Sequence, residues 1–368
     1  MLKAQGHEVH VVGIAWSDEE GAEFDRLNFV NSVTSVRGSR WAAVVRVAAA
    51  VFTQRSLQQA YTSSPRFRRV LRRELAELSP DIVYFNVVRS AQFLSLVGAE
   101  TATMVDLDER RSRFYELSSR TSTSFVARAL GRIEARRMRR AERRAEGQAG
   151  AVLYSSPVDV EDPGRDILVR SPKSAGDVRP RDSTPGRIVF VGRQCYRPNV
   201  EAVTWFADQV LPPLAREFPG VELVVVGERP SRAVKALSAR PGIVVTGRVP
   251  SIAEEYSRAQ IAIVPVRSAT GVQLKFIEAL ECGVPTVVTP VVAVGAGVED
   301  GEHTIVADSA EEWRDAIRRL LVDNDLALAM AGRASTWTVA NYSDMAVSRA
   351  LAEGVAQAMR KADVARRL

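Results

Sequence analysis

The sequence is poor in the residues that build disulfides and metal sites. It has two cysteines, Cys195 and Cys282, and three histidines, His7, His10 and His303, among 368 residues. Two isolated cysteines form no disulfide framework, and neither residue type has the spacing of a zinc site, so no bound metal is predicted. No Ser-His-Asp order is legible, which leaves a hydrolase with its own nucleophile poorly supported. Such cysteine usage suits a reducing cytoplasm.

Long apolar runs are also absent. No segment reaches eighteen consecutive apolar residues, and the most apolar one, residues 41–52 (WAAVVRVAAAVF), is shorter and carries Arg46. We predict that it is an amphipathic helix. The N-terminus lacks a basic region followed by an apolar core, so neither a transmembrane helix nor a signal peptide is expected.

Lysine is scarce although the chain is basic. All but five of the 50 basic residues are arginine, the formal net charge is +6, and the pI is about 9.6. This balance favours anionic partners. Arginines concentrate in residues 111–147, whose second half reads RIEARRMRRAERRAEG. We predict a helix with either a solvated basic face or a face on an anionic membrane; aromatic residues for stacking on nucleic-acid bases are not interleaved.

Length and composition predict two α/β domains. A chain of 368 residues exceeds one typical domain, and residues 157–186 have the Pro, Asp, Ser and Gly content of an interdomain connection. We place the N-terminal domain at residues 1–170 and the second at 171–340. Residues 341–368 are expected to form a C-terminal helix that crosses back to the first domain.

The second domain alternates short apolar runs with helical segments. Their spacing fits βαβ units, so a parallel sheet with right-handed crossovers is predicted. The runs are RIVFVGR (187–193), VELVVVGE (221–228), GIVVTGRV (242–249), IAIVPV (261–266), PTVVTP (285–290) and HTIVAD (303–308).

The N-terminal domain gives a weaker pattern. Residues 2–5 resemble the last turn of a helix, and Gly6 resembles its C-cap. A doubly wound domain normally has a strand and a glycine-rich turn before such a helix, so this first βα unit is expected to be missing. Strands are predicted at residues 7–14, 81–88, 101–108 and 149–156.

The strand at residues 101–108 ends in two acidic residues, Asp106 and Asp108. Ligands bind at the carboxyl ends of strands in open α/β sheets, so these carboxylates are candidate site residues. Two other interpretations stay open: the pair caps the next helix or anchors a loop, or it forms a metal-binding Asp-x-Asp.

Residues 261–290, IAIVPVRSATGVQLKFIEALECGVPTVVTP, carry the densest chemical signal. They predict a strand, a loop, a helix, a loop and a strand. The first loop ends in Gly271, where backbone can approach a ligand, and Lys275 lies one turn into the helix. A helix N-terminus beside a lysine binds anions, and Glu278 on the same face can accept hydrogen bonds from sugar hydroxyls. We predict a nucleotide with phosphates at Lys275 and ribose at Glu278.

Arg193 is the second predicted phosphate contact. It follows the strand that ends in Gly192, and its guanidinium can bind phosphate through two parallel hydrogen bonds. A lone arginine at a strand end is more often a surface salt bridge. Its pairing with Lys275 and the Gly271 loop favours the phosphate interpretation.

Two segments resemble the retaining glycosyltransferases of group 1, or family 4, which have the GT-B fold. VGRQCYRPNVEAVTWFADQVLPPL (191–214) resembles the family's strand-Gly-Arg/Lys signature, and TGVQLKFIEALECGVPTVVT (270–289) resembles G-x-x-x-K-x-x-E-A-x-x-x-G-x-P-V-V. The resemblance covers residues 187–342 well and the first half loosely. It implies two Rossmann-like, doubly wound parallel-sheet domains that face a cleft. It also implies sugar transfer from a nucleotide donor with retained configuration and with no metal or other cofactor.

The resemblance also implies roles for residues. Lys275 and Arg193 would bind the donor diphosphate, Glu278 the ribose hydroxyls, and the loop 247–249 the base. Thr270 stands where the family often has a glutamate that contacts the donor sugar. The donor-binding residues so predicted are Gly192, Arg193, Gly247, Val249, Thr270, Gly271, Val272, Lys275 and Glu278. The predicted catalytic residues are Arg193, Lys275, Asp106 and Asp108, the last two from the opposite domain.

The leading hypothesis is a metal-independent, hexosyltransferase-like enzyme that moves a sugar from a nucleoside-diphosphate sugar to a glycan or lipid-linked acceptor. It would act in cell-surface polysaccharide or glycoconjugate assembly, in the cytoplasm or peripherally at the inner face of the membrane. The alternative is a catalytically impaired nucleotide-sugar-binding protein of the same fold, because the first βα unit is expected to be missing. An epimerase of this architecture would need further carboxylates and a histidine, and nucleic-acid binding rests on the pI alone.

Overall fold

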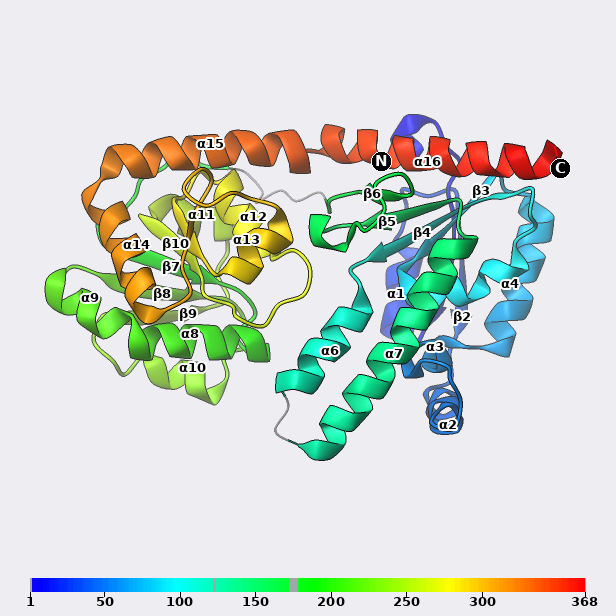
Figure 1. Ribbon diagram of the computed structural model, residues 1–368, viewed down its shortest axis with the longest axis horizontal. Coiled ribbons are helices and arrows are strands. Elements are labelled where there is room, and N and C mark those ends of the chain that lie inside the picture. The colour runs from blue at the N-terminus through cyan, green and yellow to red at the C-terminus, as the bar shows by residue number, and fades with distance from the viewer. Residues whose placement is uncertain (1, 122–123, 172–177, 368) are drawn as a thin grey trace. The chain divides into compact units, whose positions relative to one another are not determined.

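The computed structural model describes residues 2–121, 124–171 and 178–367, which divide into two compact units (Figure 1). Unit 1 comprises Met1–Ser155, Asp159–Val169 and Ser348–Leu368, and unit 2 comprises Ser156–Val158 and Arg170–Val347. Each unit is an α/β domain whose strands pair in parallel. The predicted α/β class with parallel sheets in two domains is confirmed.

Unit 1 contains two separate parallel sheets. Val12 and Ile14 of the first sheet pack on the same apolar core as Val83 and Phe85 of the second. In the described part of the chain no strand pairing joins the two sheets. The strands of unit 1 are therefore interrupted between the two sheets, although both sheets pack on one continuous apolar core. The pairs are β1 (His10–Ala15) with β2 (Ser32–Arg37), and, in order, β3 (Ile82–Asn86), β4 (Ala102–Asp108), β5 (Ala151–Tyr154) and β6 (Asp166–Leu168).

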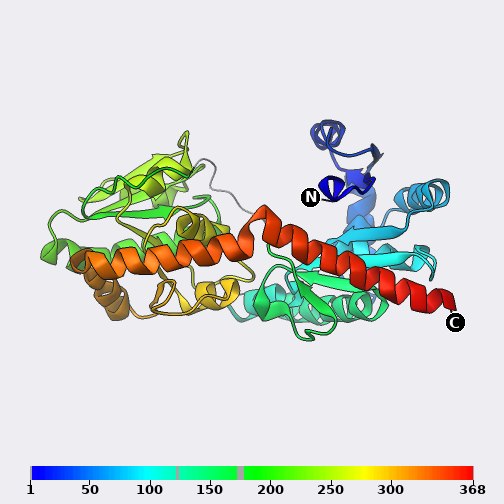
Figure 2. The same ribbon diagram turned by 90° about the horizontal axis from the view of Figure 1, so that it is seen from above.

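Helices cover both sheets of unit 1. They are η1 (Lys3–Gln5), α1 (Asp18–Asp25), α2 (Arg40–Ala50), α3 (Leu57–Thr62), α4 (Pro65–Leu78), α5 (Val87–Ser90), η2 (Ala91–Leu96), α6 (Arg111–Thr121), α7 (Phe125–Gln148) and η3 (Pro157–Asp159). The C-terminal helix α16 (Asp344–Arg367) lies along the four-stranded sheet, where Leu351, Ala358 and Ala362 pack on Met104 and Leu153 (Figure 2).

Two predictions for unit 1 need detail and one is confirmed. Residues 166–168, which we assigned to the interdomain connection, form β6, which pairs with β5. The helical region predicted at residues 111–147 consists of two helices, α6 and α7, and residues 122–123 lie outside the described part. The predicted C-cap at Gly6 is confirmed, because Gly6 ends the short 3₁₀ helix η1 with φ +89°.

Unit 2 has one six-stranded parallel sheet in the order β12-β11-β10-β7-β8-β9. The strands are β7 (Arg187–Val191), β8 (Glu222–Val226), β9 (Ile243–Gly247), β10 (Ile261–Val264), β11 (Thr286–Val288) and β12 (Ile305–Val306). All six predicted runs therefore form strands, although the last run contributes only two residues.

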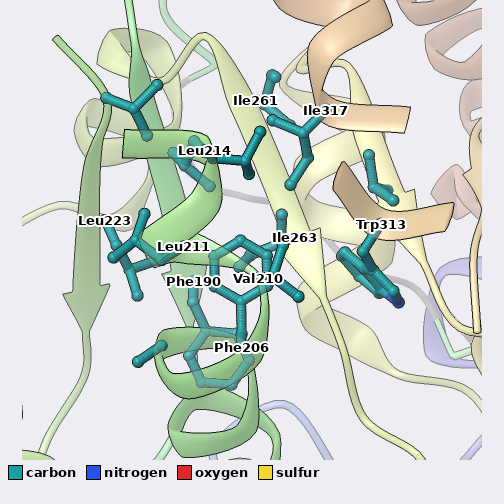
Figure 3. Close-up of a cluster of buried hydrophobic side chains, with 14 of the residues drawn as sticks. Phe190, Phe206, Val210, Leu211, Leu214, Leu223, Ile261, Ile263, Trp313 and Ile317 are labelled. Atoms are coloured by element: carbon teal, nitrogen blue, oxygen red, sulfur yellow. The ribbon is translucent and has the colours of Figure 1, made fainter. Parts of the chain in front are cut away.

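Both faces of this sheet are buried. Ile188 and Phe190 of β7 face a core with Phe206 and Trp313, whereas Val189 faces the opposite core (Figure 3). Burial on both faces explains why these strands are almost continuously apolar. The covering helices are α8 (Arg197–Gln209), α9 (Leu211–Glu217), α10 (Arg232–Leu237), α11 (Ile252–Arg258), α12 (Leu274–Glu281), α13 (Pro290–Ala296), α14 (Ala310–Val322) and α15 (Asn324–Tyr342).

Across the described ranges, every helix is too short or too polar to cross a bilayer.

Candidate functional site

The sheet of unit 2 reverses its winding at β7. From β7 the chain continues through β8 to β9, and then returns to the other side of β7 as β10. In open parallel sheets such a reversal leaves a crevice at the carboxyl ends of the two diverging strands, and ligands bind there. Arg193 follows β7, and the loop that leads to Lys275 follows β10. The sheet order therefore brings these two predicted residues to one crevice.

Glycines keep the backbone bare at this edge. Gly192, Gly227 and Gly247 end neighbouring strands with φ of +157°, +141° and +71°. A Cβ on Gly227 would lie 1.8 Å from the carbonyl oxygen of Gly192, and a Cβ on Gly192 would lie 2.7 Å from Nδ2 of Asn199. Only glycine permits this close approach of β7 to β8.

Lys275 reaches the same edge from α12. Its Nζ donates to Oδ1 of Asn199 at 2.5 Å and to Oε1 of Gln273 at 3.4 Å, and it lies 5.6 Å from the centre of the Phe190 ring. Burial lowers the pKa of Lys275 to about 8, and the Glu278 carboxylate partly offsets this effect. An ammonium with so little solvent is poised to gain from an anionic ligand.

Asn199 links the segments that follow β7 and β10, and the sequence analysis did not predict it as a site residue. Its side chain is buried, and Nδ2 donates to the carbonyl oxygen of Arg193 at 3.0 Å while Oδ1 accepts from Lys275. The sequence offered one signal for this role, an asparagine that directly follows Pro198 in the first turn of a helix. Asparagine competes with helical hydrogen bonding, so it is buried at such a position only when its side chain has partners.

Neither helix that starts at this crevice has a side-chain cap. Among the described residues, α8, with N-cap Tyr196, and α12, with N-cap Gln273, have no side-chain capping hydrogen bond, and α5, α9 and α13 elsewhere lack one too. The first turns of α8 and α12 therefore have no side-chain acceptor, although the Asn199 and Phe276 amides donate to the N-cap carbonyl oxygens, both at 2.9 Å. Serine hydroxyls cap α1, α2, α3, α4, α7, α10, α11 and α14.

Arg193 contacts the other described site residues through its backbone carbonyl oxygen, which accepts from Asn199, and not through its side chain. The side chain is 64 % exposed, and its Nε is 3.4 Å from Oε1 of Glu228. An exposed ion pair of this kind is weak, so the guanidinium is free to exchange Glu228 for a phosphate. The structure thus shows the competing surface salt bridge, and the phosphate contact stays a prediction.

Glu278 lies one turn beyond Lys275 and is buried. Beside it, the Tyr256 hydroxyl donates to the carbonyl oxygen of Lys275 at 2.7 Å, and burial, followed by the charge of Glu278, raises the pKa of Tyr256. Tyr256 therefore fixes the turn that carries both charged residues. Sequence analysis missed it because it comes from α11, outside the signature segments.

The loop between β10 and α12 is half-buried. Gly271 has φ +70°. A Cβ on Gly295 of α13 would lie 2.8 Å from the carbonyl oxygen of Gly271, so the loop is held against α13. Val272 packs on the core of this side of the sheet, Val249 packs on the other side, and Thr270 is half-buried beside Gly271. The loops that carry these predicted donor residues follow the carboxyl ends of β9 and β10.

Asp106 and Asp108 belong to unit 1, at the carboxyl end of β4. Asp106 accepts from the Tyr84 hydroxyl at 2.5 Å and from the Asp108 amide at 2.9 Å, and burial raises its pKa. Asp108 has φ +61° at a register shift between β4 and β5, and its side chain is exposed. Asp106 is thus the held carboxylate of the pair and Asp108 the exposed one.

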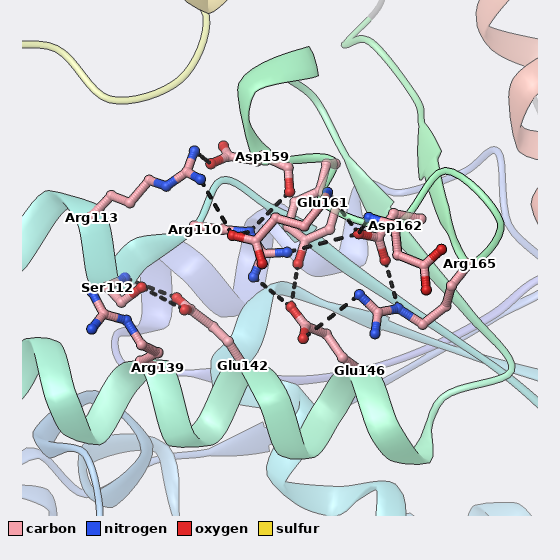
Figure 4. A network of polar contacts seen from close by, with 12 residues as sticks. Arg110, Ser112, Arg113, Arg139, Glu142, Glu146, Asp159, Glu161, Asp162 and Arg165 are labelled. Carbon is pink, nitrogen blue, oxygen red and sulfur yellow. Dashed lines mark hydrogen bonds and ion pairs between the residues drawn. The ribbon is translucent and has the colours of Figure 1, made fainter.

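A buried network of charged side chains follows Asp108 (Figure 4). Arg110 pairs with Glu146 at 2.6 Å and lies 4.8 Å from the centre of the Tyr154 ring. Glu142 accepts from the Ser112 amide at 2.8 Å and from its hydroxyl at 2.6 Å. The network fixes the start of α6 on α7, next to a polar cavity of about 300 Å³.

The metal-binding interpretation of Asp106 and Asp108 finds no third ligand. Over the ranges that the structure describes, no three His, Cys, Asp or Glu side chains cluster in a way that could hold a metal ion.

Comparisons with known proteins point to one family. Residues 185–323 match the family model described as Glycosyl transferases group 1. A search of curated protein sequences finds no match.

Solved structures share the fold of the whole chain. A sucrose-phosphate synthase from Thermosynechococcus elongatus is 14 % identical with a TM-score of 0.64, over 95 % of this chain and 98 % of that one. HepE of Anabaena, in complex with UDP, is 11 % identical with a TM-score of 0.62, over 95 % and 100 %. WaaG, a glycosyltransferase involved in lipopolysaccharide biosynthesis, is 16 % identical with a TM-score of 0.57, over 96 % and 92 %.

The matched residues include β7, β10 and α12, and so the crevice with Gly192, Arg193 and Lys275. Residues 185–323 of unit 2 therefore match a group 1 glycosyl transferase model, and the chain has the fold of the GT-B glycosyltransferases.

Proposed function

We propose that the protein transfers a sugar, with retained configuration and without a required metal, from a nucleoside-diphosphate sugar to a glycan or lipid-linked acceptor. The observation that carries this proposal is the crevice of unit 2, where Lys275 and Asn199 meet the bare backbone of Gly192. The family of residues 185–323 supports the reaction class. HepE structures in complex with UDP and with UDP-glucose support a uridine nucleotide as the first donor to test.

The electrostatics of the crevice suit a departing diphosphate. The Lys275 ammonium and the first-turn amides of α8 and α12 place positive charge where negative charge develops on the leaving group. Arg193 joins them by leaving Glu228. Glu278 would hold the ribose hydroxyls, and the loops at Gly247–Val249 and Thr270–Val272 would contact the base and the sugar.

The acceptor side of the proposal rests on unit 1. Asp108 is exposed at the carboxyl end of β4 and could orient a sugar hydroxyl, with Asp106 holding its backbone. Cell-surface polysaccharide or glycoconjugate assembly, with contact at the inner face of a membrane, is the setting that we infer for such an acceptor. The involvement of WaaG in lipopolysaccharide biosynthesis supports this class of acceptor.

The alternative function is nucleotide-sugar binding without turnover. It is favoured by the interruption between β1 and β3 in unit 1, because a sheet without continuous pairing supports an acceptor site less rigidly.

A panel of nucleotide sugars tests the proposal. The purified chain is incubated with UDP-, GDP- and ADP-hexoses and a set of glycan and lipid-linked acceptors, and products are identified by mass spectrometry with and without EDTA. We expect one donor to give an acceptor product whose new bond keeps the donor's anomeric configuration, at an unchanged rate in EDTA. Binding of a donor without any product would support the alternative.

A further inference from the structure

Helix α2 turns its apolar side to solvent. Trp41, Val44, Val45 and Phe52 have exposed fractions of 78 %, 52 %, 53 % and 91 %. Their spacing places them along one side of the helix and its extension. The other side of the helix is buried and carries small residues, among them the fully buried Ala43. A helix of a folded domain normally buries such a stripe, so this one indicates a partner.

Contacts with neighbouring helices fix this orientation. Arg46, in the middle of α2, donates to the carbonyl oxygens of Ala60 and Tyr61 at 3.3 and 3.2 Å, away from the apolar side. At the end of α2, Arg137 of α7 donates to the carbonyl oxygen of Val51 at 2.8 Å. The exposed stripe is therefore held in place by α3 and α7.

Helix α7 extends the apolar surface. Phe125, Val126, Leu130 and Ile133 are exposed by 75 %, 65 %, 50 % and 43 %. Val126, Leu130, Ile133 and Arg137 follow one another at intervals of four, three and four residues, so they share a side of the helix. Because Arg137 contacts Val51, this side adjoins α2, and both helices lie at the same end of unit 1 (Figure 1).

The exposed charges that α2 and α7 contribute have one sign, although Glu116 of the neighbouring α6 pairs with Arg139 at 2.9 Å. Helix α7 contains eight arginines, of which seven are exposed, whereas its only acidic residues, Glu134, Glu142 and Glu146, are buried. Residues 26–73, which include α2, contain ten arginines and no aspartate or glutamate. The α7 sequence has three carboxylates, but its outer surface offers cations alone.

We propose that this α2–α7 surface, formed by Trp41, Val44, Val45, Phe52, Phe125, Val126, Leu130 and Ile133 with the arginines of α7, docks on an anionic phospholipid bilayer. The aromatic and branched side chains would enter the interfacial layer while the guanidinium groups bind lipid phosphates. The inference goes beyond the proposed reaction and does not depend on it, because the nucleotide crevice lies in unit 2.

Charge and side-chain chemistry favour lipid over other partners. In a symmetric contact between two copies, arginines would face arginines, which costs free energy. A nucleic acid would satisfy the arginines and leave Val44, Val45 and Leu130 facing a polar backbone, because aliphatic side chains do not stack on bases. A bilayer with anionic headgroups satisfies both the apolar and the cationic residues.

Vesicle cosedimentation tests the proposal with the full chain. We expect binding to vesicles of phosphatidylcholine with roughly one-third phosphatidylglycerol to be about tenfold or more stronger than to phosphatidylcholine alone, and to weaken as salt is raised. A Trp41→Ser, Phe52→Ser variant should lose roughly tenfold or more of that affinity. An Arg132→Glu, Arg136→Glu variant should lose roughly 25-fold, at about fivefold for each arginine removed.

Matched controls come from exposed positions of unit 2. Val322→Ser with Val339→Ser, and Arg216→Glu with Arg319→Glu, make the same kinds of change elsewhere and should leave vesicle binding unchanged. Circular dichroism and UDP titration show whether each variant is folded. The proposal is overturned if the parent does not prefer anionic vesicles, if both α2–α7 variants bind like the parent, or if the aromatic variant only dissociates a dimer.

Discussion

The carboxyl edges of the two units are built differently. In unit 1, side chains of the protein occupy the edge: Glu142 binds the first turn of α6 through Ser112, and Tyr84 holds Asp106. In unit 2, three neighbouring strands, β7, β8 and β9, end in glycine, and α8 and α12 begin without side-chain caps in the described chain. The two edges thus differ in capping: side chains of the protein bind the strand and helix ends in unit 1, whereas in the part of unit 2 that the structure describes no N-cap side chain binds the starts of α8 and α12.

This difference indicates where a small anionic ligand binds. Amides at helix starts need an acceptor. In the described chain serine side chains cap eight helices, whereas α8 and α12, which both start at the crevice, have no side-chain cap. Lys275 stands at that crevice with its pKa lowered by burial. In the described residues no N-cap side chain binds the first turns of α8 and α12 in unit 2, whereas Glu142 binds that of α6 in unit 1.

Closing the bare backbone should have the largest effect. We expect Gly227→Ala to reduce nucleoside-diphosphate affinity roughly 100-fold or more, because its Cβ would lie 1.8 Å from the Gly192 carbonyl oxygen and force β7 and β8 apart. Calorimetric titration with UDP measures this, alongside the melting temperature. Gly220→Ala, where a Cβ would meet nothing within 4 Å, should bind like the parent. Equal affinity for both variants would remove the argument from close approach.

Removal of the buried ammonium should have the next largest effect. Lys275→Met keeps the length of the side chain and removes its charge, so we expect about a 50-fold loss of affinity, which corresponds to about 2–3 kcal/mol. Lys235→Met, on exposed α10, is the matched control and should change nothing. A Lys275 variant that binds as tightly as the parent would place the phosphates elsewhere.

Affinity should also depend on pH. Since the pKa of Lys275 is about 8 in the free protein and a bound phosphate raises it, the ammonium is already present below pH 8, and binding must take up a proton above it. The effect of Lys275 on affinity should level off below about pH 7, and affinity should fall about tenfold between pH 7 and 9. Lys275→Arg, which stays charged, should give a flat profile. A parent profile that is equally flat would contradict the role of burial.

Arg193 should contribute less. Its guanidinium is exposed and must leave Glu228, so Arg193→Ala is expected to weaken binding only about three- to fivefold. Glu228→Gln frees the guanidinium and should strengthen binding slightly. If Arg193→Ala matched Lys275→Met in its effect, the exposed arginine would be a principal ligand.

The smallest effect on nucleotide affinity is expected in unit 1. Glu142→Gln removes the buried carboxylate that binds Ser112 and should lower the free energy of unfolding by about 1–3 kcal/mol without changing UDP affinity. Glu116→Gln breaks an exposed pair with Arg139 and should cost about 0–1 kcal/mol. Denaturant unfolding and UDP titration measure both. A loss of UDP affinity in Glu142→Gln would show that the two edges are coupled.

Much of unit 2 could be predicted from the sequence, and less of unit 1. Strands buried on both faces, such as β7 and β10, are continuous apolar runs that periodicity finds directly. Strand β2, with the sequence SVTSVR, is largely exposed and carries no such signal, and β6 is a three-residue strand within a polar segment. Their formation depends on pairing with β1 and β5, which local sequence does not specify.

The candidate site divides in the same way. Residues within the signature segments, such as Lys275, could be predicted because loop, helix start and charge lie close in sequence. Asn199 and Tyr256 could not, since their roles depend on contacts 76 and 19 residues away along the chain. The exposed apolar side of α2 was equally hidden, because its amphipathic pattern does not say which side faces the core.

Calorimetric titration of the unmodified chain with UDP, GDP and ADP tests the central claim most directly. The uncapped helix starts and Lys275 predict that at least one of these nucleotides binds at about one per chain, with proton uptake above pH 8. If none of the three binds, the edge of unit 2 is not a nucleotide site, and the difference between the two edges has another cause.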